Sequence, residues 1–212
     1  MLLFFQPIFS QATKWDSTYR PGNYALKLAQ FRSYPNSNKD IIFLGNSIMD
    51  YTEWNELLQL KNARNRGISG DISFGVLERL NEVTEGKPAK VFILIGINDI
   101  ARNIPDSVII NNYKKIISRI KNESPRTKIY FHTLLPVNNT FPDKNQFNKD
   151  AHILFVNEAL KKLAVAEKIT LIDIHSQFLD ENKKLIKNFT YDGLHLNTEG
   201  YIKWASILKQ YL

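Results

Sequence analysis

The chain has 212 residues, of which 43% are hydrophobic and 12% are aromatic, a composition typical of one globular domain of ordinary size. It contains no cysteine, which excludes disulfide frameworks, zinc ribbons, iron–sulfur sites and cysteine nucleophiles. The formal net charge is +7, but the Lys and Arg residues are scattered along the chain, so we expect a solvated basic surface and no nucleic-acid partner.

The first twelve residues differ from the rest of the chain. Apolar residues at positions 2–5, 8 and 9 are followed by Ser10-Gln11-Ala12, which places small residues at the −3 and −1 positions of a cleavage site. No Lys or Arg precedes the apolar residues. We therefore expect residues 1–12 to be either the remnant of an export signal, which implies a periplasmic or extracellular protein, or an N-terminal arm of a cytoplasmic one. Residues 13–212 then form a single domain, and no apolar run approaches the roughly 18 residues of a membrane span.

Five short segments are predicted strands, and helical segments alternate with them. The strands are expected at residues 41–44, 62–65, 91–95, 128–134 and 169–174, of which the third and fifth are nearly continuous apolar runs typical of strands buried on both faces. Apolar residues recur with helical spacing at 24–31, 73–83, 109–120, 153–164 and 201–212, the last opened by Asn197 or Thr198 as a cap.

Strands that alternate with helices predict βαβ units and a parallel sheet covered on both faces. The expected fold class is therefore α/β, a three-layer α/β/α sandwich around a flavodoxin-like, five-stranded parallel sheet of order 2-1-3-4-5. The segment 136–149 is polar and long for a connection between two elements, so we interpret it as a lid or a substrate-binding loop.

Polar side chains follow the first and third predicted strands. In an open α/β sheet, ligands bind outside the carboxyl ends of the strands at the point where the strand order reverses, here between strands 1 and 3. Gly45-Asn46-Ser47 follows strand 1 and Gly96-Ile97-Asn98-Asp99 follows strand 3. A hydroxyl and a carboxamide are thus expected side by side where a site should lie.

Two further motifs follow the fifth and the second strands. In Asp192-Gly193-Leu194-His195, the carboxylate can accept from the imidazole Nδ1–H and leave Nε2 free to take a proton from a serine. The glycines of segment 65–71, which ends in Gly70-Asp71, allow a tight loop with backbone N–H groups pointing into the crevice. Each motif alone is more often a turn or a cap, so the prediction depends on their joint order at the strand ends.

These motifs resemble the four signature blocks of the SGNH, or GDSL-like, hydrolase superfamily, across residues 41–201 and most closely in its platelet-activating-factor-acetylhydrolase-like and carbohydrate acetylesterase branch. The resemblance implies that Ser47 is the nucleophile, that His195 is the general base and that Asp192 orients His195. It also implies an oxyanion hole formed by the backbone N–H groups of Ser47 and Gly70 and the side-chain amide of Asn98. The chain departs from the family pattern at two positions, where Asn46 replaces the usual Asp and Ile48 the usual Leu.

The resulting prediction is a serine esterase that hydrolyses short-chain esters, acetyl above all, on a carbohydrate or another polar alcohol, through an acyl-enzyme and without cofactor or metal. Its partner is then a small-molecule or glycan ester. A lysophospholipase or thioesterase of the same superfamily and a non-catalytic glycan-binding relative are the alternatives. A metal-dependent phosphoesterase is a further alternative, with dispersed ligands at Asp50, Asp71, Asp99, Asp192 and His195.

The remaining histidines and the tryptophans are assigned mostly to structure. His132, His152 and His175 lack a metal-ligand spacing and are predicted to be structural or surface residues. Trp54, seven residues after Ser47, is the one tryptophan that we consider as a residue lining the site.

Overall fold

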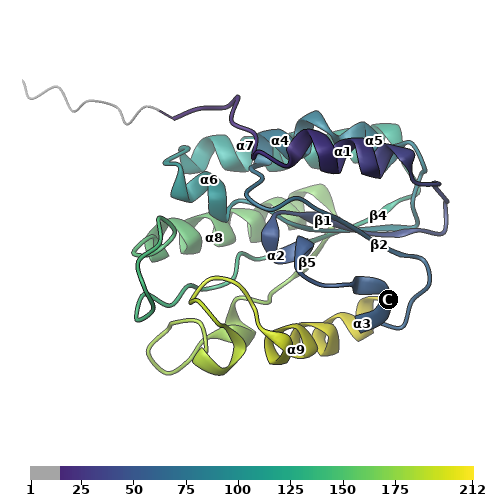
Figure 1. Cartoon of the computed structure of the whole chain (residues 1–212). Helices are drawn as coiled ribbons and strands as arrows, with labels where there is room; N and C mark the ends of the chain where they lie inside the picture. The colour runs from purple at the N-terminus through teal and green to yellow at the C-terminus, as the bar shows by residue number, and fades with distance from the viewer. Residues whose placement is uncertain (1–14) are drawn as a thin grey trace, which may run out of the picture.

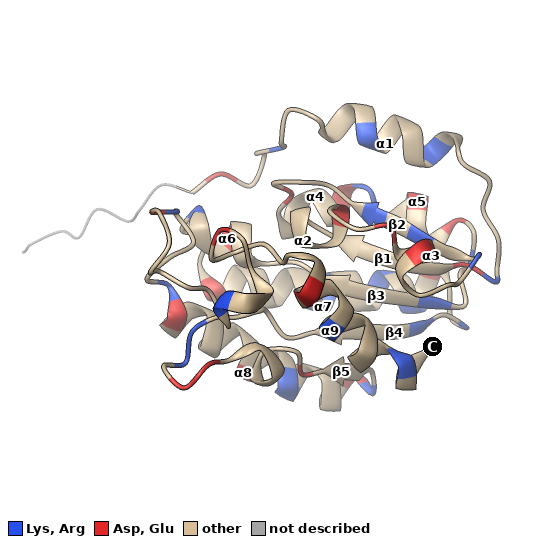
Figure 2. Ribbon diagram, turned by 60° about the horizontal axis from the view of Figure 1, so that its bottom comes forward, with Lys and Arg blue, Asp and Glu red and all other residues tan. Residues whose placement is uncertain are grey.

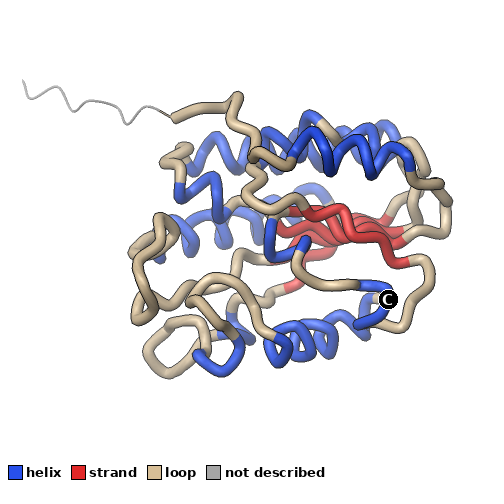
Figure 3. The backbone as a smooth tube through the Cα atoms, viewed as in Figure 1, coloured by secondary structure: helices blue, strands red, loops and turns tan. Residues whose placement is uncertain are grey.

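The computed structural model describes residues 15–212, so the export signal or arm expected at residues 1–12 lies outside the described residues. Five parallel strands form one sheet with the order β2-β1-β3-β4-β5, which confirms the predicted fold class and strand order. The sheet is the middle layer of the molecule, between two layers of helices (Figure 3). The strands are β1 (Ile41–Gly45), β2 (Ala63–Gly67), β3 (Lys90–Leu94), β4 (Lys128–His132) and β5 (Thr170–Ile172).

Helices cover both faces of this sheet (Figure 1). One layer contains α1 (Tyr24–Ser33), α4 (Ser73–Glu78), α5 (Leu80–Thr84) and α7 (Asp106–Glu123), and α8 (Asp150–Glu167) packs beside α7. The opposite layer contains α3 (Trp54–Leu57) and α9 (Thr198–Leu208). Two short helices, α2 (Ser47–Asp50) and α6 (Ile97–Ala101), directly follow β1 and β3, and 3-10 turns occupy Ser176–Phe178, Lys187–Phe189 and Lys209–Tyr211. Within residues 15–212, no helix is both long and apolar enough to span a membrane.

The register of the central strands builds an aromatic core. Phe43 of β1 lies opposite Phe92 of β3, which lies opposite Tyr130 of β4, and their rings stack at centroid distances of 5.1 and 4.5 Å. Trp54 stacks on Phe43 at 4.2 Å and meets Trp204 of α9 edge to face. Because Trp54 is fully buried in this core, the prediction that it lines the site is wrong.

Single polar side chains determine where two of the predicted elements end. Asn157 lies on the apolar face of α8, where its amide accepts from the Leu134 N–H at 2.7 Å and donates to the Leu134 carbonyl at 3.0 Å. The backbone of Leu134 is therefore satisfied without a neighbouring strand, and β4 ends at His132 instead of continuing to residue 134. The helix predicted at 73–83 is divided between α4 and α5 at Arg79, whose buried side chain reaches toward the ends of β1 and β2.

Candidate active site

Ser47 is the first residue of α2, immediately beyond the carboxyl end of β1. Asn46 caps this helix because its Oδ1 accepts from the Ile48 N–H at 3.0 Å. The neutral amide thus orders the turn in the place where the resemblance leads one to expect an aspartate. Ser47 Oγ lies 2.9 Å from His195 Nε2, within hydrogen-bond distance.

The turn that contains Gly70 lies next to α2. Asp71 N–H donates to the Ile68 carbonyl at 3.0 Å, and Gly70 has a φ of +82°, a conformation that glycine adopts without the strain of a side chain. Asp50, the last residue of α2, accepts from the Ser69 hydroxyl at 2.8 Å and so ties this turn to the serine-bearing helix. Gly67 lets the two approach, because a Cβ there would collide with the backbone of Asp50.

A buried ion pair between Arg79 and Asp71 stabilises the turn that contains Gly70. Arg79 donates to the Asp71 carboxylate at 3.1 Å and to the carbonyls of Gly45 and Arg66 at 3.1 and 2.9 Å. Burial raises the pKa of Asp71, and the adjacent Arg79 guanidinium opposes that rise. The guanidinium therefore links the ends of β1 and β2 to the residue that follows Gly70.

Asn98 approaches from α6, in the crevice between β1 and β3. Its Nδ2 donates to the Asp71 carbonyl at 3.0 Å, and its Oδ1 accepts from Gln146 Nε2 at 3.1 Å. Since a carboxamide has two N–H donors, these contacts fix its orientation and leave one N–H for a ligand. Within residues 15–212, the backbone N–H groups of Ser47 and Gly70 donate to no acceptor, so they are available to the same ligand.

His195 is oriented by its own loop. Its Nδ1 lies 2.7 Å from Asp192 Oδ2, while Asp192 Oδ1 accepts from the backbone N–H groups of Leu194 and His195 at 3.0 and 2.8 Å. Burial favours the neutral acid, but these hydrogen bonds from His195 and Leu194 hold the pKa of Asp192 at about 2. An imidazole that donates from Nδ1 to this carboxylate presents the lone pair of Nε2 to Ser47. The structure therefore brings together Ser47, His195 and Asp192, as well as Gly70 and Asn98.

The sequence of residues 43–202 matches the model of the GDSL-like Lipase/Acylhydrolase family. The chain belongs to this family. It is 30% identical over 170 residues to the rat (Rattus norvegicus) protein named platelet-activating factor acetylhydrolase IB subunit alpha2, covering 77% of this chain and 72% of the relative. A GDSL acylhydrolase is a hydrolase that acts on esters.

Solved structures of related proteins have the same fold. A Streptococcus pneumoniae protein, described as a candidate platelet activating factor, superposes with a TM-score of 0.81 at 29% identity over 89% of this chain and 92% of that one. A GDSL-like lipase from Bacteroides thetaiotaomicron superposes with a TM-score of 0.78 at 26% identity over 89% and 96% of the two chains.

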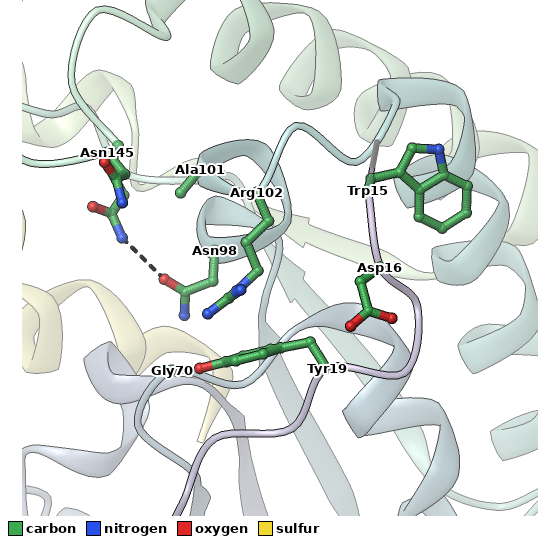
Figure 4. A pocket seen from close by; sticks show the side chains of 9 residues that line it. Trp15, Asp16, Tyr19, Gly70, Asn98, Ala101, Arg102 and Asn145 are labelled. Atoms are coloured by element: carbon green, nitrogen blue, oxygen red, sulfur yellow. Dashed lines mark hydrogen bonds between the residues drawn. The ribbon is translucent and has the colours of Figure 1, made fainter. Parts of the chain in front are cut away.

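Two hollows of very different size lie at or near the motif segments of this GDSL-like acylhydrolase. The smaller is a cavity of about 10 Å³ whose walls include Ile48, Ile97 and Leu194. These three residues are the sequence neighbours of Ser47, Asn98 and His195, which do not themselves line the cavity. The larger, of about 460 Å³, is lined by Trp15, Asp16, Tyr19, Gly70, Asn98, Ala101, Arg102, Asn145 and Gln146 (Figure 4). The predicted substrate loop 136–149 contributes Asn145 and Gln146, whereas no motif in the sequence marks Tyr19 or Arg102.

The five residues of the phosphoesterase alternative do not form one group. Asp50 pairs with Lys27 at 2.7 Å, Asp71 pairs with Arg79, and Asp99 accepts from the Ser73 N–H at 3.0 Å. Among residues 15–212, no cluster of three or more His, Asp or Glu side chains is placed to hold a metal ion. Each carboxylate has a protein partner of its own.

The other three histidines lie away from the reacting groups. His132 is buried under Trp204, and burial lowers its pKa to about 4. His152 pairs with Asp106 on the surface, and His175 Nδ1 contacts the Leu134 carbonyl at 2.9 Å. These contacts are the structural ones that the sequence predicts.

Proposed function

We propose that this protein is a serine esterase that removes acetyl groups from a polar alcohol such as a carbohydrate. The observation that carries the proposal is a chain of two contacts, Ser47 Oγ to His195 Nε2 at 2.9 Å and His195 Nδ1 to Asp192 Oδ2 at 2.7 Å. Beside it lie the backbone N–H groups of Ser47 and Gly70, which have no acceptor within residues 15–212. A hydroxyl, a base and an orienting carboxylate next to unused donors are the components of acyl transfer.

Each group has one role in the reaction. Ser47 Oγ attacks the ester carbonyl carbon while His195 Nε2 takes its proton. The carbonyl oxygen becomes an oxyanion that accepts from the N–H groups of Ser47 and Gly70 and the amide of Asn98. The C–O bond to the alcohol then breaks, and the alcohol leaves with the proton from His195. Water repeats the attack on the acyl-enzyme, again losing its proton to His195, and releases acetic acid and Ser47.

The size of the smaller cavity supports an acetyl group. We assign the acyl group to this cavity because Ile48, Ile97 and Leu194 in its walls are the sequence neighbours of Ser47, Asn98 and His195. About 10 Å³ accommodates roughly one water-sized group, which matches a methyl and excludes a chain of several methylenes. Its apolar walls, among them Ile48, Ile97 and Leu194, are buried side chains in the core of the domain. They have little freedom to move apart because protein interiors are close-packed. The name of the rat relative, an acetylhydrolase, is consistent with this acyl group.

The surroundings of His195 support a polar alcohol. Tyr51 and Tyr191 are exposed, and their rings lie 5.0 and 5.9 Å from the imidazole, so their faces are available to stack on a sugar ring. The larger hollow adds the amide groups of Asn145 and Gln146, which donate to and accept from hydroxyls.

The test is ester turnover as a function of acyl length. The kcat/KM should be highest for 4-nitrophenyl acetate and should fall steeply through butyrate and octanoate, because longer chains meet the walls of the small cavity. The Ser47→Ala variant should lose on the order of 10³-fold or more in kcat without unfolding, while Ser206→Ala, an exposed serine on α9, should behave as the wild type.

Three outcomes would contradict the proposal. A preference for octanoate would favour the lipase or lysophospholipase alternative over an acetylesterase. Turnover of no ester at all would favour the glycan-binding alternative. A folded Ser47→Ala variant with near-normal kcat would remove Ser47 from the mechanism.

A further inference from the structure

The larger hollow presents a positive charge next to the oxyanion donors. Arg102 directly follows α6, four residues after Asn98, and its guanidinium carbon lies 3.1 Å from the centre of the Tyr19 ring (Figure 4). Stacking on an aromatic face holds the guanidinium flat and reduces the number of orientations it samples. Its planar edge is therefore preorganised for a ligand.

No carboxylate of residues 15–212 forms an ion pair with Arg102. Asp16 is the one acidic residue among those that line the hollow. Its Oδ1 accepts from the N–H and the hydroxyl of Thr18, both at 2.7 Å. These hydrogen bonds, and to a smaller extent the charge of Arg102, lower the pKa of Asp16, but the two side chains form no ion pair. The guanidinium of Arg102 has five N–H donors and uses none of them on an acceptor within the described part of the chain.

The hollow begins at the oxyanion donors themselves. Gly70 and Asn98 belong to its walls, and the Tyr19 hydroxyl lies only 3.6 Å from where a Cβ on Gly70 would be. A substrate whose carbonyl oxygen lies between these donors therefore borders this space. With the acyl methyl assigned to the small cavity, the group that enters the larger hollow is the alcohol part of the ester.

We propose that Arg102 selects alcohols that carry a carboxylate near the ester, such as an acetylated acidic sugar. The inference rests on the proposed esterase function and adds to it the charge of the substrate. The fork of the guanidinium matches the two oxygens of a carboxylate, while Asn145 and Gln146 contact neighbouring hydroxyls. The net charge of +7, spread over many elements (Figure 2), adds a general attraction for such an anion.

The experiment compares two substrates that differ only in this charge. They are an O-acetylated methyl glucuronoside as the free acid and the same compound as its uncharged methyl ester. The wild type should show a kcat/KM about tenfold higher for the acid at low salt, an effect kept modest because Arg102 is exposed. The preference should shrink in 0.5 M NaCl, which screens an exposed charge pair.

Variants assign this preference to one residue. Arg102→Gln should abolish it and Arg102→Lys should retain part of it, because lysine keeps the charge but loses the planar fork. Taking the ratio of the two substrates within each variant cancels any general loss of activity. Arg126→Gln, the same change at an exposed arginine before β4 at the opposite end of the sheet, should leave the ratio and the rates unchanged.

The outcomes separate this inference from the proposed function. If the wild type hydrolyses 4-nitrophenyl acetate but does not prefer the acid, or if Arg102→Gln keeps the preference, the inference is wrong and the esterase stands. If neither sugar is hydrolysed while 4-nitrophenyl acetate is, the inference is also wrong. If no ester is hydrolysed, the proposed function itself fails.

Discussion

The acid–base side and the oxyanion side of this site are stabilised in different ways. The side chains of His195 and Asp192 remain 16% and 18% exposed and are held mainly by hydrogen bonds within their own short loop. Lys144 of the 136–149 loop adds an ion pair, with its Nζ 3.3 Å from Asp192 Oδ2. Asn98 instead donates to the backbone of Asp71, whose carboxylate pairs with Arg79 where both side chains are fully buried. One side depends on local contacts near solvent, and the other depends on a buried polar network.

Two carboxylates, Asp192 on the acid–base side and Asp99 on the oxyanion side, show the same contrast. Hydrogen bonds from His195 outweigh burial and hold the pKa of Asp192 at about 2, so this group stays ionised at every working pH. Asp99, which follows Asn98, is completely buried, and burial raises its pKa to about 7. The acid–base side thus keeps a permanent negative charge that stabilises an imidazolium. The oxyanion side offers mainly neutral donors, held in place by a buried polar network.

Asp192→Asn should have the largest effect, and it should affect catalysis alone. The new side chain can still accept the two backbone N–H bonds, but its NH₂ group then faces His195 Nδ1 and favours the tautomer with a proton on Nε2. That tautomer cannot take a proton from Ser47. We expect kcat to fall on the order of 10³-fold or more, with little change in melting temperature.

The control for this variant is Asp143→Asn, the same change at an exposed aspartate of the 136–149 loop. It should leave both kcat and stability unaltered. A loss of several degrees in the melting temperature of Asp192→Asn, with kcat preserved, would reverse the roles that we assign to the two sides.

Arg79→Met should be the corresponding stability variant. It leaves the Asp71 carboxylate buried without its partner and removes donors from the carbonyls of Gly45 and Arg66. Breaking a buried pair in this way costs about 3–5 kcal/mol of unfolding free energy, measured by urea denaturation. Lys161→Met, which removes an exposed pair with Glu158, should change stability by less than about 1 kcal/mol. Equal small losses of stability in both variants would disprove the inference that the buried Arg79–Asp71 pair stabilises the oxyanion side.

Asn98→Ala tests whether the Asn98 amide stabilises the oxyanion during the reaction. The amide matters mainly when negative charge develops on the carbonyl oxygen, so kcat should fall by roughly 10²–10³ while KM changes little. Steady-state kinetics on 4-nitrophenyl acetate separate the two parameters. A rise in KM with kcat preserved would mean that Asn98 binds the substrate in its ground state.

The sequence predicts the position of Ser47, Gly70 and Asn98 because they closely follow strands. Carboxyl ends of parallel strands meet at one edge of the sheet, so correct strands and a correct order place Ser47 beside Asn98 without any knowledge of side-chain packing. Asp192 and His195 do not directly follow β5, which ends at Ile172, but their contact is predictable because they are three residues apart within one loop.

The substrate side could not be predicted in the same way. Tyr19 precedes the first helix and reaches Gly70 only through the path of the chain across the folded domain. Arg102 looks like an ordinary surface arginine until its stacking partner is known. Arg79 interrupts a continuous helical pattern because its side chain bonds to carbonyls on two strands, a tertiary contact that local spacing does not encode.

Asp99→Asn gives the smallest effect and the sharpest test of burial on the oxyanion side. The Asp99 carboxyl has a pKa of about 7 in the folded protein and 3.8 in the unfolded chain. At a pH between these two values, it is still protonated in the native state but already ionised in the unfolded state. Between about pH 4 and 7 the native state therefore binds more protons, so this group makes stability fall as the pH rises, and the loss is complete above pH 7.

Asparagine is neutral in both states and lacks this loss. The difference in unfolding free energy between Asp99→Asn and the wild type should therefore shift in favour of the variant between pH 5 and pH 8, by on the order of 2 kcal/mol. Asp71 and Glu82, whose pKa values burial also raises, are present in both proteins and cancel in this difference. The exposed Asp143→Asn should show a constant difference over the same range. If Asp99→Asn does so too, Asp99 is ionised in the native protein and the oxyanion side carries a buried negative charge that its hydrogen bonds from Ser73 must stabilise.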